Sequence, residues 1–60
     1  MLNPKEVERL RTLMRGIEPK GVKLRMAFAT DIDSKTTKQR LDEIVSDVAE
    51  IVQLMEKLEA

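Results

Sequence analysis

Residues 41–58, LDEIVSDVAEIVQLMEKL, contain neither proline nor glycine and repeat apolar side chains at steps of three and four. This spacing places apolar side chains on one face of an α-helix. Nothing interrupts a helix from about residue 34 to residue 59, so the sequence predicts one long amphipathic helix there. Its apolar stripe consists of Leu41, Ile44, Val45, Val48, Ile51, Val52, Met55 and Leu58.

The apolar stripe is too wide and too long for this chain to cover alone. At about 100° per residue, the eight side chains span about 140° of the helix, whereas a two-stranded coiled coil needs only a narrow seam. Twenty-six residues make a helix of about 39 Å, and a compact domain of 60 residues is only about 27 Å across. We therefore expect these eight residues to form a dimer interface, with a second copy or with a larger protein subunit.

The segment before this helix, residues 22–29 (VKLRMAFA), alternates apolar and other side chains. A period of two is typical of a half-buried strand. Methionine and alanine do not favour strands, so a short helix is the alternative. A single strand has no partner within its own chain, and its open edge would pair with another chain.

The N-terminal segment carries helix-start signals. Asn3 is a good N-cap, Pro4 suits the first helical position, and Glu6 completes a capping box. Gly16 is a plausible helix end, and residues 18–21 (EPKG) have the composition of a turn. The sequence thus predicts a helix over residues 4–16, a turn, a strand and a long helix. The expected fold class is α+β, in one small interaction domain over residues 1–60 that dimerises through the long helix and the strand.

The residue inventory argues against catalysis. The chain has no cysteine and no histidine, which excludes disulfides and the usual zinc sites. Asp31 and Asp33 resemble the start of a calcium loop, but Lys35 and Thr36 stand where an oxygen ligand and a glycine belong. We interpret the two aspartates as carboxylates near a helix start, where Asp33 or Ser34 is the expected cap. We expect no catalytic residue, no cofactor and no metal.

Charge is balanced overall, with eleven Lys/Arg and eleven Asp/Glu, but it is unevenly distributed. Residues 1–40 carry ten basic and five acidic side chains, and residues 41–60 carry one basic and six acidic ones. The basic half could meet phosphate groups, so nucleic acid is expected only indirectly or through this half. No apolar run approaches the length of a membrane span or a signal peptide, so we expect a cytoplasmic protein without membrane contact.

Residues 23–58 resemble the small non-catalytic subunits of the KEOPS complex. The resemblance lies in Lys23-Leu24-Arg25 at the start of a strand, followed by a polar connection and a helix. That helix places Leu41, Val45, Val48, Val52 and Met55 inward. The resemblance implies a small strand-plus-helix protein that pairs as a homodimer or heterodimer and supports a catalytic subunit. It also implies a role in the threonylcarbamoyl modification of adenosine in tRNA.

A DNA-binding repressor or antitoxin is the alternative function. Lys23 and Arg25 alternate with Val22 and Leu24, so a ribbon of two such strands would present four basic side chains on one face. A two-stranded ribbon can enter the major groove of DNA. This resembles ribbon-helix-helix repressors, although their order is strand, helix, helix. Lys23 and Arg25 are therefore the candidate nucleic-acid contacts.

Overall fold

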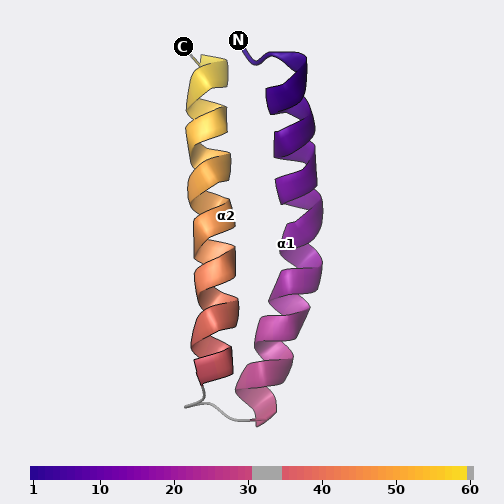
Figure 1. The fold of residues 1–60 in the computed structure, drawn as a ribbon, viewed down its shortest axis with the longest axis vertical. Coiled ribbons are helices and arrows are strands. Elements are labelled where there is room, and N and C mark those ends of the chain that lie inside the picture. The colour runs from indigo at the N-terminus through magenta and orange to yellow at the C-terminus, as the bar shows by residue number, and fades with distance from the viewer. Residues whose placement is uncertain (31–34, 60) are drawn as a thin grey trace.

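The computed structural model describes residues 1–30 and 35–59, which form a hairpin of two long helices. Helix α1 spans Pro4–Thr30 and helix α2 spans Lys35–Glu59. The two helices lie side by side and antiparallel, so the N- and C-termini meet at one end (Figure 1). The molecule measures 42 × 16 × 13 Å, and its radius of gyration is 13.8 Å. A compact chain of 60 residues would have a radius of gyration of about 10 Å, so this fold is a rod.

The predicted α+β fold class is wrong. Neither residues 1–30 nor residues 35–59 contain a strand, and residues 16–29 continue the first helix. Gly16 and Gly21 have no positive φ angle, so neither makes the left-handed turn that ends many helices. Leu24 and Ala27 are half-buried, whereas Met26 and Phe28 are exposed. Burial therefore follows a helical period rather than the period of two, because packing against α2 overrides the local signals.

Pro19 lies inside α1 instead of in a turn. Its nitrogen carries no hydrogen, so the Arg15 carbonyl four residues earlier lacks its usual helical donor. The side chain is exposed, and α1 bows away from α2 near its middle (Figure 1). Proline is a common cause of helix bending. The proline therefore bends this helix without ending it.

The predicted start of the first helix is confirmed. Pro4 is the first helical residue. The Asn3 Oδ1 atom accepts a hydrogen bond of 2.8 Å from the Glu6 backbone N–H, and Glu6 Oε1 accepts one of 3.1 Å from the Asn3 N–H. This reciprocal pair satisfies two backbone donors at the helix start. At the other end, the Thr30 hydroxyl donates to the Met26 carbonyl at 2.9 Å.

The predicted long helix is confirmed as Lys35–Glu59, but its expected overhang is wrong. Since α1 continues to Thr30, it runs beside α2 for nearly the whole length of that helix. The proposed cap at Asp33 or Ser34 and the aspartates of the calcium-loop comparison lie outside the described residues.

The two helices meet along a seam with steps of three and four. Within the described ranges, Leu13 and Leu54 are the buried hydrophobic residues, with 4% and 7% of their surface exposed. A half-buried row flanks them on each helix. It contains Leu10, Ile17, Lys20, Leu24 and Ala27 on α1, and Thr37, Arg40, Ile44, Asp47 and Ile51 on α2. This alternation is typical of coiled-coil packing.

Candidate interaction surface

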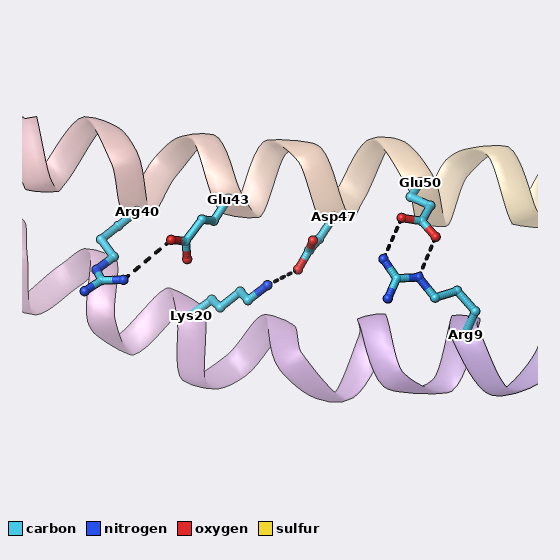
Figure 2. Close-up of polar contacts among 6 residues, drawn as sticks. All are labelled: Arg9, Lys20, Arg40, Glu43, Asp47 and Glu50. Carbon is cyan, nitrogen blue, oxygen red and sulfur yellow. Dashed lines mark hydrogen bonds and ion pairs between the residues drawn. The ribbon is translucent and has the colours of Figure 1, made fainter.

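Ion pairs join the two helices within the seam and along one side of it, and we call the side that carries Arg9 and Glu50 the ion-paired face. Arg9 Nε donates to Glu50 Oε2 at 2.6 Å, and Arg9 Nη2 donates to Glu50 Oε1 at 2.9 Å. Lys20 Nζ donates to Asp47 Oδ2 (Figure 2). Lys57 Nζ donates to Glu6 Oε2 near the termini. These contacts fix which levels of α1 and α2 lie opposite one another.

The ion pairs shift the pKa values of the groups involved. The Arg9 guanidinium, hydrogen bonded to Glu50, holds the pKa of that carboxyl below its ordinary value, and Glu50 in turn raises the pKa of Arg9. Lys57 and then the Asn3 backbone N–H lower the pKa of Glu6 by hydrogen bonding its carboxylate. All three groups are charged at neutral pH, so this side of the hairpin is polar and internally paired.

The opposite side of the seam is apolar. At about 100° per residue, Met14 lies about 140° from Arg9 around α1, and Val48 lies about 160° from Glu50 around α2. Because Arg9 and Glu50 meet on one side of the seam, Met14 and Val48 lie on the other side. The hairpin as a whole is therefore amphipathic, with one polar side and one apolar side, each made by both helices.

We call this second side the apolar face. Its side chains come from both helices, and 39% to 57% of the surface of each is exposed. They are Met14 and Phe28 on α1, and Leu41, Val45, Val48, Val52 and Met55 on α2. Isolated exposed apolar residues are common on monomers, but a continuous row along two helices is typical of an interaction site.

A recess of about 420 Å³ lies on the apolar face toward the Thr30 end of the hairpin. It is lined by Gly21, Leu24, Arg25, Phe28, Thr37 and Leu41. Gly21 leaves it open, because a Cβ atom placed there would meet nothing within 4 Å beyond its chain neighbours and its own helix backbone. The recess has the shape and the chemistry to accept an apolar side chain from another polypeptide.

The structure divides the eight predicted interface residues between two roles. Ile44 and Ile51 pack in the seam between α1 and α2. Five of the others belong to the apolar face, and Leu58 is half exposed near the chain termini. The place of all eight residues in a dimer stays a prediction. The exposure of the six that lie outside the seam agrees with the expected excess of apolar surface.

Lys23 and Arg25 are exposed on a helix, so the two-stranded ribbon that was to present them to DNA is wrong. Arg25 lines the recess of the apolar face. Lys23 follows Arg9 by fourteen residues, which is close to four turns of the helix, so Lys23 lies on the side of α1 that carries Arg9. The two basic side chains therefore do not share one surface.

Four residues that matter most were not among the predicted interface residues: Leu13 and Leu54 in the seam, and Met14 and Phe28 on the apolar face. The available signal was the continuation of three- and four-residue steps through Ile17, Lys20, Leu24 and Ala27. That signal was obscured by a lysine in the series and by the glycines and proline beside it.

Two classes of feature are missing from the part of the chain that the structure describes. No three histidine, cysteine, aspartate or glutamate side chains gather there as a possible metal site. Neither α1 nor α2 combines the length and the apolar content that crossing a membrane requires. The apolar face is thus the most distinctive chemical feature of the described residues.

The fold defines the chain as an antiparallel αα-hairpin with one apolar and one ion-paired face. No protein-family model, no curated protein and no solved structure matches it.

Proposed function

We propose that this chain is a non-catalytic accessory or assembly protein that works by presenting its apolar face to another polypeptide. The observation that carries the proposal is the contrast between the two sides of the seam. The ion-paired face satisfies its charges within the chain, whereas the apolar face leaves seven large side chains in contact with water. Covering them would contribute about 25 cal/mol for each Å² of apolar surface removed from water.

The setting in a tRNA-modifying complex stays a prediction. The strand expected at residues 23–25 is helical, so the similarity to KEOPS subunits now rests on the spacing of apolar residues in α2. Co-purification of this chain with a threonylcarbamoyl-transferring subunit would support that setting.

An aspartate in the centre of the apolar face tests the proposed function. In Val48→Asp the new charge would have to be buried on association, and an unpaired buried charge costs several kcal/mol. Val52→Asp is the second variant, and Ser46→Asp is the control, since it adds the same charge to an exposed position on the other side of α2. Each tagged chain would be co-expressed in its native host with an untagged copy of the same chain. The proteins that the tagged chain retains during purification would be quantified by mass spectrometry.

We expect the wild type and Ser46→Asp to retain a partner, and Val48→Asp and Val52→Asp to lose it. Circular dichroism would confirm that all four chains remain helical. Equal retention by the Val48→Asp variant and the wild type would contradict the proposal, and so would the absence of any partner for the wild type.

A further inference from the structure

We infer that the polypeptide covering the apolar face is a second copy of this chain. In this dimer α1 of each copy lies across α2 of the other, with the Thr30 ends of both hairpins together. The inference rests on the proposed function, because it names the partner of the same face. The result is a four-helix bundle whose two-fold axis runs parallel to the helices.

The amount of exposed surface agrees with such a dimer. The chain exposes 4853 Å² for a mass of 6.9 kDa. A compact monomer of that mass would expose about 4,000 Å², so the hairpin has about 850 Å² in excess. A stable interface of standard size buries about 800 Å² on each partner. One copy of the hairpin therefore has enough excess surface to supply one side of such an interface.

Charge selects the way in which the two copies meet. Helix α1 carries seven basic and three acidic side chains, and α2 carries four basic and six acidic ones. Placing α1 on α2 of the other copy therefore brings opposite net charges together. The other symmetric arrangement places α1 on α1 and α2 on α2, which brings like net charges together.

The borders of the apolar face show the same complementarity at the level of single residues. Arg25 lines the recess of the apolar face beside Phe28, and Asp42 neighbours Val45 three residues along α2, where Lys38 of the same helix also hydrogen bonds its carboxylate. Counted from the Lys20–Asp47 hydrogen bond, both lie five residues toward the Thr30 end. A two-fold axis parallel to the helices preserves these levels, so Arg25 of one copy lies beside Asp42 of the other.

The same count pairs the opposite end of the face. Arg11 lies nine residues from Lys20, and Glu56 lies nine residues from Asp47, both toward the chain termini. Arg11 neighbours Met14, and Glu56 neighbours Val52, so both border the apolar face. The dimer therefore has an Arg–carboxylate contact near each end of each α1–α2 crossing between copies.

In the inferred dimer, the recess at Gly21 faces the apolar side chain of Val45 from the other copy at nearly the same level along the helix axis. Val45 is 57% exposed, which makes it the most exposed of the seven apolar-face residues. Val45 lies two residues from Asp47 toward the Thr30 end, and Gly21 lies one residue from Lys20 in the same direction. The levels of Val45 and Gly21 along the helix axis therefore differ by one residue, or about 1.5 Å. Val45 of the second copy therefore lies over the space that Gly21 leaves open.

Single cysteines test this arrangement, because the native chain contains none. A disulfide forms only between residues whose Cα atoms approach within about 7 Å. An equimolar mixture of the Gly21→Cys and Val45→Cys chains should form covalent dimers under mild oxidation, with at least a fivefold higher yield than either variant alone. Val48→Cys alone is the control, since its two copies lie on diagonal helices in the inferred bundle.

The Val48→Cys control also detects the competing arrangement, in which α1 packs on α1 and α2 on α2. Val48 lies near the middle of α2, so in the arrangement with α2 on α2 its two copies would face each other. Efficient disulfide formation by Val48→Cys alone, with none in the Gly21→Cys and Val45→Cys mixture, would overturn the inferred arrangement. Light scattering on the cysteine-free chain at micromolar concentration should give twice the mass of one chain.

The same mass measurement separates this inference from the proposed function. A wild-type chain that stays monomeric in light scattering overturns the second copy as partner. If that monomer still binds a different protein and Val48→Asp does not, the proposed function stands while the homodimer fails. If the wild type neither dimerises nor retains any other protein, both fail.

Discussion

Lys20 of α1 donates a hydrogen bond to Asp47 of α2 inside the seam, where the neighbouring positions of the same rows are Ile17, Leu24, Ile44 and Ile51. The Asp47 side chain is only 15% exposed and that of Lys20 35% exposed, so the pair is more protected from water than the other ion pairs of the hairpin. A polar pair in a hydrophobic seam favours the one register in which both partners meet, because any slip would leave each charge among apolar side chains.

A double-mutant cycle should find coupling between these two residues. We expect Asp47→Ala alone to lower the free energy of unfolding by about 1 kcal/mol, because Lys20 loses its partner in a partly dry seam. The cycle with Lys20→Ala should give a coupling of about 1 kcal/mol in urea titrations at one protein concentration. The control is the more exposed Arg40–Glu43 pair within α2, which takes no part in the inferred dimer contacts and for which about 0.3 kcal/mol is expected. Equal coupling in both cycles would show that the seam pair has no special role.

Acid should weaken the hairpin through Glu6 and Glu50. Both carboxyls have a pKa below the ordinary value of 4.5 in the folded chain, because each is hydrogen bonded to a cation of the other helix. A depressed folded-state pKa stabilises the fold above the unfolded-state pKa, and this contribution is lost as pH falls through the folded-state value. Stability should therefore be level above about pH 5 and fall at lower pH.

The Glu50→Gln variant tests the source of that acid sensitivity. Thermal unfolding followed by circular dichroism between pH 3 and pH 7 (about the range over which carboxyls titrate) should show a shallower acid decline than in the wild type. Glu59→Gln is the control, because Glu59 is exposed at the end of α2. A Glu50→Gln profile parallel to that of the wild type would remove the Arg9 pair as the cause.

Replacing Gly16 by alanine discriminates between the helix that we predicted over residues 4–16 and the observed one over 4–30. In the observed helix Gly16 has no positive φ, and an added Cβ would meet nothing within 4 Å. Alanine should then raise the free energy of unfolding by about 0.5–1 kcal/mol, because glycine is the poorer helix former. A left-handed helix end at this position would give the opposite sign, since alanine is strained there. Urea titration of Gly16→Ala against the wild type decides the sign.

That contrast shows what was predictable from the sequence and why. Asn3, Pro4 and Glu6 act through neighbours in the chain, so their capping box could be read directly, as could the long helix, which nothing interrupts. Residues 16–29 depend instead on a surface of α2 that is distant in the sequence. Glycine and proline there weaken a helix without forbidding it, and packing against α2 decides the outcome.

The interaction surface was partly predictable for the same reason. The α2 stripe follows from its spacing, but its division into seam and apolar face requires knowing where α1 lies. Ile44 and Ile51 then belong to the seam, while Met14 and Phe28 join the apolar face from the other helix.

Leu54 and Val52 should separate the energetics of the seam from those of the apolar face. Leu54→Ala removes a side chain that is 7% exposed, so it should cost about 2–5 kcal/mol, a large part of the stability of so small a fold. Val52 is 48% exposed, so Val52→Ala should cost less than about 1 kcal/mol in dilute protein. Urea titrations at a concentration where light scattering shows only monomer measure both values. A larger cost for Val52→Ala would mean that hairpin folding itself requires a covered apolar face.

Charge reversal at Arg25 and Asp42 should control which chains pair in the dimer inferred above. Arg25→Glu faces two like-charge contacts in its homodimer, and Asp42→Lys does the same, so each variant alone should dimerise at least tenfold more weakly than the wild type. In an equimolar mixture, one chain of each kind restores two favourable contacts. The introduced glutamate of the first variant meets the introduced lysine of the second, and the native Arg25 of the second meets the native Asp42 of the first. Selective heterodimer formation of this kind follows from repulsion in the wrong pairs as much as from attraction in the right one. Native mass spectrometry of the mixture should show mainly heterodimers. The control is a mixture of Lys23→Glu and Asp42→Lys, which should show no such preference because Lys23 lies away from the apolar face. A mixture that remains monomeric would contradict the pairing of Arg25 with Asp42 even if the wild type dimerises.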